Sequence, residues 1–352
     1  MQEKRFILDC IAGKTSPDNL VDYKYIFEIS KKNRISPLIY NRGIKNNKVV
    51  NEDIKKELKR QYYINSIRNM VFLKELKKIN KKLKQNKIEY FVLKGLILAK
   101  KIYGDYNFRE QTDIDILIKN KKNIEQISNI LFSMGYFYSG KIQTYNYWKK
   151  FGPHIVFTKD TAGFKVNLEI HWLLLNKKNN PFNLREKYLL KNPSTETIGK
   201  TEFSTLCDEH TFIYLCLHMC YQHAFRTVLR DMSDIVNMTD SINLNWEAII
   251  RDSKKWRCLT FVYFSLKKVI EIFNLKEYSP IINRISYNKK HLLLLETRFP
   301  ESIFEINHKS YIKDFIYYLK LNENLTDKIG LTYQAAYYLV EKIRKNLLKQ
   351  KL

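Results

Sequence analysis

Two aspartates one residue apart stand at the start of an apolar stretch of the chain, "DIDILIK". Successive side chains of a β-strand alternate between its faces, so Asp113 and Asp115 share one face with Leu117, and the neighbouring isoleucines take the other. Two carboxylates at this spacing can bind one or two hard divalent cations. A strand start that simply faces solvent would carry the same pair, so the pair alone leaves both explanations open.

A second stretch, "KVNLEIHW", repeats this alternation. Asn167, Glu169 and His171 share one face there. If the two strands are neighbours, Glu169 completes a cluster of three carboxylates, which normally holds a metal ion or a proton because like charges repel. Mg²⁺ or Mn²⁺ suits carboxylate oxygens best. His171 either orients Glu169, contacts a phosphate or packs as a neighbour.

Positively charged residues precede the aspartate pair. Lys94 and Gly95 end an earlier apolar stretch at "LKG", and a helix is expected to begin at Leu96. A glycine lets the backbone approach a ligand closely, and the N-terminus of a helix favours an anion. Arg109 can offer a bidentate pair of donors to a phosphate. Together with the carboxylates, these residues predict a site for a metal-bound phosphate ester.

Helices are expected before this site. Residues 1 to about 88 have helical patterns, and the longest predicted helix ends near Asn86. Its apolar residues recur every three or four positions, as one helical face requires. They are Ile64, Ile67, Val71, Phe72, Leu76, Ile79 and Leu83.

After that helix the composition becomes β-branched and aromatic. The expected strands are "IEYFVLKG", "DIDILIK", "HIVFTK" and "FKVNLEIHWLL", with helices at about 96–103 and 121–134. This order predicts a small mixed sheet whose later, short-looped strands run antiparallel. The polar stretch "NPSTETIGKTEFSTLCDEH" that follows is expected to be a loop.

From about residue 209 to the end, helical patterns return. The last stretch, "TYQAAYYLVEKIRKNLLKQKL", is either a solvated final helix or a basic arm for nucleic acid or a membrane surface. The predicted fold class is α+β. A small mixed β-sheet core flanked by helices (89–204) is expected between a helical N-terminal region (1–88) and a helical C-terminal domain (205–352).

The composition of the 352-residue chain suggests an anionic partner. The formal net charge is +26, from 62 basic and 36 acidic residues, which is typical of proteins that bind phosphate esters or RNA. However, 48 of the basic residues are lysines, and asparagine, isoleucine and tyrosine are also abundant. A codon pool rich in A and T explains this equally well, so the charge does not decide whether RNA is a partner.

The five cysteines are too irregular for a disulfide framework, and no apolar run approaches the ~20 residues that span a bilayer. A soluble, cytoplasmic protein without a membrane partner is therefore expected. Cys216, Cys220 and His223 share one helical face, with His218 nearby, a spacing that would suit zinc. Burial of the cysteines in a core is the better explanation, because no second cluster has zinc-finger spacing.

Three stretches resemble a known family in their order and content. They are "FVLKGLILAKKIYGDYNFREQTDIDILIK", "VNLEIHW" and "LCLHMCYQHAFRTVLRDMSDI". Between about residues 65 and 240 the chain is similar to the uncharacterised bacterial nucleotidyltransferase family of the DNA polymerase β-like superfamily. In the third stretch, Arg230 and Asp234 are expected either to form ion pairs or to face the cleft.

The resemblance implies transfer of a nucleoside monophosphate from a nucleoside triphosphate (NTP) such as ATP, with Mg²⁺. By matching positions, Asp113 and Asp115 would bind the metal and Glu169 would be the third carboxylate. The superfamily has Gly-Ser before its aspartate pair, whereas this chain has Lys94 and Gly95, so Lys94 is the candidate replacement for the serine. The acceptor is open: a small molecule, a peptide or protein, or RNA. A non-catalytic nucleotide-binding or RNA-binding module and a toxin-like transferase acting on tRNA are the alternatives.

Overall fold

The computed structural model describes residues 2–14, 21–47, 49–140, 145, 149, 152–175, 180–184, 193–306, 310–323, 325–326 and 328–332. Its N-terminal part is helical, as predicted. The helices are α1 (Gln2–Ile11), α2 (Tyr23–Lys32), α3 (Ser36–Ile39) and α4 (Glu52–Gln85). At two of these helix starts a side chain accepts hydrogen bonds from the unpaired backbone N–H groups: Asp22 caps α2 and Asn51 caps α4.

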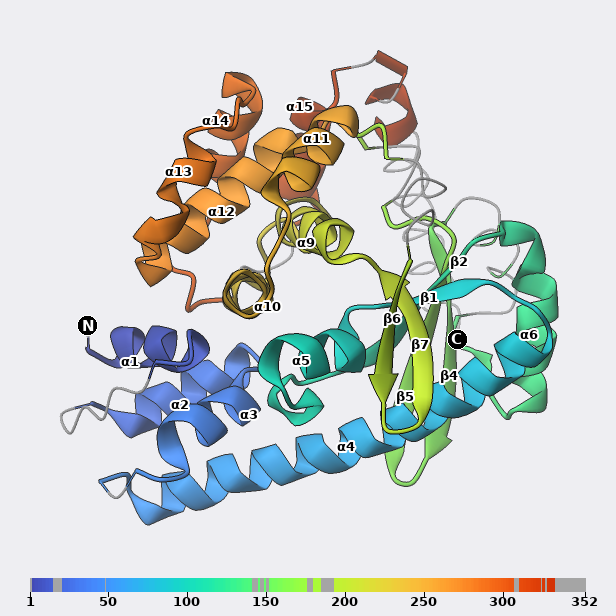
Figure 1. The fold of residues 1–352 in the computed structure, drawn as a ribbon, viewed down its shortest axis with the longest axis horizontal. Coiled ribbons are helices and arrows are strands. Elements are labelled where there is room, and N and C mark those ends of the chain that lie inside the picture. The colour runs from blue at the N-terminus through green and yellow to red at the C-terminus, as the bar shows by residue number, and fades with distance from the viewer. Residues whose placement is uncertain are drawn as a thin grey trace, which may run out of the picture.

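Helix α4 runs along one side of the molecule, from the N-terminal helices to the sheet (Figure 1). It ends at Gln85 with Asn86 as its cap, where the sequence predicted its end. Its second half packs on the sheet through buried residues that the helical period had identified, including Phe72, Leu76 and Ile79. The predicted face is wrong at Ile67, whose side chain is 53% exposed.

A mixed sheet of seven strands forms the centre of the described residues, in the order β3-β4-β5-β2-β1-β7-β6. The strands are β1 (Tyr90–Leu93), β2 (Asp113–Ile118), β3 (Phe137–Tyr138), β4 (His154–Thr161), β5 (Phe164–His171), β6 (Pro193–Ile198) and β7 (Thr201–Leu206). β2 runs parallel to β5 and antiparallel to β1, and β4 pairs antiparallel with β5. Helices α5 (Gly95–Tyr103) and α6 (Ile124–Ser133) connect the strands, so the predicted mixed sheet is confirmed.

The polar stretch predicted as a loop forms the hairpin β6–β7 instead. Gly199, with φ 65°, lies in its turn, and β7 extends the sheet beside β1. The two strands are rich in threonine, which favours strands, and β6 alternates mostly polar side chains at the sheet edge. The prediction failed because polarity indicates exposure, and an edge strand is exposed as well.

Helices also make up the C-terminal part, as predicted. They are α9 (Asp208–Leu217), α10 (Val228–Ser241), α11 (Trp246–Lys255), α12 (Leu259–Phe273), α13 (Ser279–Ile282), α14 (Lys289–Arg298) and α15 (Tyr311–Leu321). The expected final basic helix lies outside the described residues from residue 333 onward. Among the described helices, none combines the length and the apolar character needed to cross a membrane.

Two hydrophobic cores lie on opposite faces of the sheet. One packs the isoleucines of β2 against α4 and α6. The other joins the opposite sheet face, through residues such as Leu117, to α5 and to both the N-terminal and the C-terminal helices. The face with the predicted carboxylates therefore turns toward the C-terminal helices. The division of the chain at residues 88 and 204 stays a prediction.

Candidate active site

Two neighbouring parallel strands bring the predicted carboxylates to one face of the sheet. In the pairing of β2 with β5, Asp115 lies opposite Glu169 and Asp113 lies opposite Asn167. The isoleucines of β2 are buried on the other face, as the alternation of the strand predicts. The structure thus places Asp113, Asp115 and Glu169 together, and their role as metal ligands stays a prediction.

Two histidines contact these carboxylates from β5 and β4. The Nε2 atom of His171 lies 3.1 Å from Asp115 Oδ1 and 3.2 Å from Glu169 Oε2. His154 lies opposite His171 in the sheet, with its Nε2 3.7 Å from Glu169 Oε2. Burial would lower the pKa of His171, but its hydrogen bonds to the two carboxylates raise the pKa to about 9. Burial and the charge of His171 lower the pKa of His154 to about 4, so only His171 is protonated at neutral pH.

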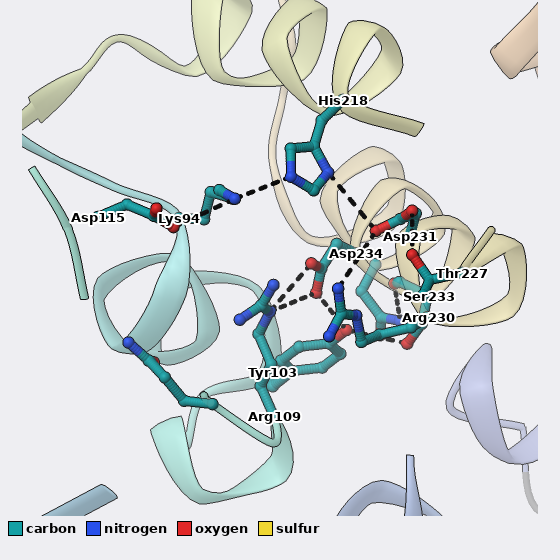
Figure 2. A network of polar contacts seen from close by, with 12 residues as sticks. Lys94, Tyr103, Arg109, Asp115, His218, Thr227, Arg230, Asp231, Ser233 and Asp234 are labelled. Atoms are coloured by element: carbon teal, nitrogen blue, oxygen red, sulfur yellow. Dashed lines mark hydrogen bonds and ion pairs between the residues drawn. The ribbon is translucent and has the colours of Figure 1, made fainter. Parts of the chain in front are cut away.

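Lys94 reaches the same carboxylates from the end of β1. The preceding residue, Leu93, pairs with Asp115 across the sheet, and Lys94 Nζ lies 3.1 Å from Asp115 Oδ2. The ammonium group also lies 2.9 Å from His218 Nε2 (Figure 2). The centre of the Tyr214 ring is 5.7 Å away. Only 11% of the Lys94 side chain is exposed. The structure therefore brings Lys94 beside the carboxylates, and its contact with a phosphate stays a prediction.

The carboxylates differ in how their charge is compensated. Burial would raise the pKa of Asp115, but the Lys94 ammonium and the His171 hydrogen bond hold this pKa well below its ordinary value. Burial would raise the pKa of Glu169, but the His171 hydrogen bond and the electrostatic effect of His154 and His171 together lower it. The pKa of Asp113 is raised by burial and by the neighbouring Asp115. The ionised form of Asp113 is thus disfavoured by burial and repulsion, and a cation would relieve both effects.

The turn from β1 into α5 holds two consecutive residues in the left-handed region. Lys94 has φ 43° and Gly95 has φ 60°. For a lysine this conformation costs on the order of 1–3 kcal/mol, which the surrounding structure must offset. A Cβ atom on Gly95 would lie 2.7 Å from Nε2 of Gln111, a buried side chain that donates a hydrogen bond to the Asp113 carbonyl at 2.5 Å. Because Gly95 has no Cβ, the start of α5 can pack closely against Gln111, which in turn is hydrogen-bonded to the start of β2.

A Gly95→Ala substitution is expected to lower the free energy of unfolding by about 2–3 kcal/mol, from backbone strain and from displacement of Gln111. Gly104→Ala is the matched control, because Gly104 has φ 75° with no atom near the position of a Cβ. It should cost only the strain, about 1 kcal/mol. Urea denaturation of both variants measures the difference. Equal losses of the free energy of unfolding would show that the Gln111 side chain can move aside without cost.

Arg109 is held by a residue of the C-terminal helices. Its Nε donates to both carboxylate oxygens of Asp234 on α10, at 3.0 and 3.1 Å (Figure 2). The Tyr103 hydroxyl donates to the same carboxylate at 3.0 Å, and Asn69 of α4 holds the Arg109 carbonyl. Of the two expectations for Asp234, the ion pair is therefore confirmed. A contact between Arg109 and a phosphate stays a prediction.

The side chains considered for zinc separate into two groups. Cys216 and Cys220 are buried, burial raises the pKa of Cys216 to about 12, and the Cys220 Sγ lies 3.2 Å from the Ser265 hydroxyl. Both thiols therefore lie in the core, as the preferred explanation of burial predicted. His218 and His223 instead converge on Asp231, which the sequence did not indicate: His223 Nδ1 lies 3.0 Å from Asp231 Oδ2 and His218 Nδ1 lies 3.7 Å from Asp231 Oδ1.

His154 was missed from the sequence, although a signal for it was present. The dipeptide Ala162-Gly163 connects β4 to β5 as a two-residue turn, with Thr161 opposite Phe164. Two-residue turns determine hairpin register. Counting outward from this turn pairs His154 with His171 and so brings it to the candidate site.

Comparisons with known proteins concern the family and leave the site residues untested. The family described as "Uncharacterised nucleotidyltransferase" matches residues 19–274. An antigenic nucleotidyltransferase-like protein from Paracoccidioides brasiliensis is similar in structure, with a TM-score of 0.41 and 16% sequence identity, over 62% of this chain and 94% of that protein. No curated protein matches the sequence. Because the family match spans most of the chain, and wider than the three stretches that carried the resemblance, the chain belongs to this uncharacterised nucleotidyltransferase family.

Proposed function

We propose that the protein transfers a nucleoside monophosphate from an NTP to an acceptor hydroxyl, with a divalent cation, in the manner of the DNA polymerase β-like superfamily. One observation carries the proposal: Asp113, Asp115 and Glu169 meet on one face of the sheet, beside the Lys94 ammonium. Membership of a nucleotidyltransferase family supports the reaction class. The cytoplasm, where NTPs are abundant, is the proposed location.

The donor atoms fit Mg²⁺ or Mn²⁺. Asp113, Asp115 and Glu169 offer carboxylate oxygens, which both ions prefer, and a cation would offset the repulsion that raises the pKa of Asp113. Lys94 and His171 compensate the charge of the other two carboxylates through non-covalent contacts, which a bound cation could replace. When bound, the ion would polarise the phosphate oxygens and lower the pKa of the acceptor hydroxyl.

The proposed reaction is an in-line displacement at the α-phosphorus of the NTP. The acceptor oxygen forms a bond to this phosphorus, the bond to the bridging oxygen of the β-phosphate breaks, and pyrophosphate leaves with the electron pair. The hydroxyl proton passes to Glu169, whose side chain is 25% exposed, against 6% for Asp115. Lys94 and Arg109 offset the negative charge of the triphosphate, aided by the N-terminus of α5.

A labelling experiment tests this function. Purified protein is incubated with cell extract, Mg²⁺ or Mn²⁺, and each of the four common NTPs carrying label at the α-phosphate. We expect label to enter an acceptor whose size class shows whether it is a small molecule, a protein or RNA. The label should be absent with NTPs labelled at the γ-phosphate, because pyrophosphate leaves.

The variants in this experiment decide the assignment of the site. Asp113→Ala/Asp115→Ala should abolish label transfer, since it removes two of the three carboxylates. Asp160→Ala is the control, because Asp160 is an exposed aspartate of the neighbouring strand β4. Equal transfer by the wild type and the double variant would refute the assignment, and binding of an NTP without any turnover would favour the non-catalytic alternative.

A further inference from the structure

A chain of polar contacts leads from the carboxylates to helix α10. Lys94 lies between Asp115 and His218, and the other ring nitrogen of His218 faces Asp231 of α10 (Figure 2). Asp231 is itself fixed, because Thr227 donates to its Oδ2 at 2.8 Å and His223 lies 3.0 Å from the same oxygen. Each member of the chain is more than nine-tenths buried except Lys94 and the flanking His223 and Thr227.

The proton positions along this chain follow from its chemistry. Lys94 is charged, and an ammonium group only donates hydrogen bonds, so His218 Nε2 must accept. Burial and the Lys94 charge lower the pKa of His218 well below its ordinary value, so the ring is neutral and carries its one proton on Nδ1. That proton points toward the carboxylate of Asp231, which thereby selects the tautomer.

We propose that His218, oriented by Asp231, is a positioning residue that holds Lys94 for the phosphates of the donor NTP. This inference rests on the proposed function. Among the described residues Lys94 has two acceptors, the charged Asp115 and the neutral His218. When a cation takes over Asp115, Lys94 loses that partner and keeps His218. A neutral imidazole holds the ammonium group in place without cancelling its charge, which then remains available to a phosphate.

The same residues are less suited to a second metal site. His218, His223 and Asp231 lie close enough together to hold an ion. An ion on His218 Nδ1 would move the ring proton to Nε2, where it would face the Lys94 ammonium at 2.9 Å with no acceptor between them. Arg230 also lies 4.0 Å from Asp231 and adds positive charge. The donor arrangement therefore favours a chain of polar contacts over a metal site.

Binding measurements test the proposal. The probe is the α,β-methylene analogue of whichever common NTP the wild type binds best, titrated calorimetrically with Mg²⁺. His218→Leu removes the acceptor and should weaken binding by about 10-fold or more. His218→Gln can place an amide oxygen near Nε2 and should restore most of the affinity. His210→Leu is the control, because His210 is a similarly buried histidine, 3.2 Å from Asp252, away from the site.

A double variant distinguishes positioning from a general loss of structure. If His218 acts only through Lys94, then Lys94→Ala/His218→Leu should bind the analogue as weakly as Lys94→Ala alone, within about twofold. Additive losses, or equal losses in His210→Leu, would overturn the proposal. A wild type that binds no NTP would instead refute the proposed function, and this inference with it.

Nitrogen-15 NMR of histidine-labelled protein reports the tautomer of His218 directly, with the His218 side chain in place. The wild type should show His218 protonated on Nδ1. Asp231→Asn should shift the ring toward the Nε2 tautomer, since its amide can donate to Nδ1, and should weaken analogue binding. An Nε2 proton in the wild type would overturn the proposal. So would about one tightly bound zinc per chain that is lost in His223→Ala.

Discussion

Asparagine in place of either aspartate of β2 is expected to reduce nucleotidyl transfer by at least about 100-fold to 1,000-fold, and yet to change the free energy of unfolding in opposite directions. Both substitutions keep the size of the side chain and remove one negative charge from the proposed metal site. The loss of activity should therefore be similar for the two variants. Their stabilities differ because the two carboxylates have different neighbours.

Asp115→Asn should destabilise the fold by about 3 kcal/mol. Asp115 is buried and accepts contacts from two cationic groups, Lys94 at 3.1 Å and His171 at 3.1 Å. An amide in its place leaves the Lys94 ammonium buried without its only anionic contact at this distance among the described residues. A buried charge without its partner is one of the larger single costs known for proteins.

Asp113→Asn should instead stabilise the metal-free protein by about 1 kcal/mol. Asp113 lies among the like charges of Asp115 and Glu169, and burial and this repulsion raise its pKa. A folded-state pKa above the ordinary value means that the ionised form of Asp113 opposes folding at neutral pH. The amide removes that repulsion and keeps the shape.

Urea denaturation without metal and label transfer with Mg²⁺ measure the two effects on the same preparations. Asp160→Asn, on the exposed part of β4, should change neither quantity by much. Loss of stability in both variants of β2 would mean that the favourable contacts of Asp113, such as the Thr112 hydroxyl 3.3 Å from its Oδ2, outweigh the repulsion. Retained activity in either one would remove that carboxylate from the proposed site.

The face of each strand that carries the site could be predicted from the sequence, because it depends only on alternation within a strand. Asp113, Asp115 and Glu169 each lie on the face that their position in the sequence required. Whether β2 and β5 are neighbours in the sheet could not be predicted from the sequence. Pairing between strands about 50 residues apart depends on packing of the whole sheet, which no local pattern contains.

The contribution of helix α10 lay further beyond a local reading. Asp231 and Asp234 are more than 100 residues from the cations they serve, Lys94 and Arg109. Their spacing of three places them on one side of a helix, but only the fold shows which surface that side meets. The place of the hairpin β6–β7 beside β1 is likewise a long-range pairing.

Removal of only one partner of the ion pair between Arg109 and Asp234 should destabilise the fold strongly, because the other charge then stays buried and unpaired. The side chains are 11% and 3% exposed, so Asp234→Leu leaves a guanidinium group buried without its carboxylate. We expect this variant to lose about 3–5 kcal/mol of the free energy of unfolding. Arg109→Met should lose less, because the Tyr103 hydroxyl still donates to Asp234.

The double variant Arg109→Met/Asp234→Leu should recover most of this stability, because an apolar pair of similar volume replaces a buried ion pair at little net cost. Tyr103 keeps a partner there, since its hydroxyl lies 2.9 Å from that of Ser233. Urea denaturation of the two single variants and the double variant measures the coupling. Additive losses would show that the two residues act separately.

Nucleotide binding by the same double variant decides what Arg109 is for. Both hydrogen bonds from Arg109 to Asp234 come from Nε, so this carboxylate engages neither terminal amino group. We expect these amino groups to meet a phosphate. If Arg109 contacts the donor, the stable double variant should still bind the NTP analogue about 10-fold more weakly than the wild type. Full recovery of affinity together with stability would mean that Arg109 only joins α10 to the sheet, and that Lys94 and the N-terminus of α5 meet the triphosphate without it.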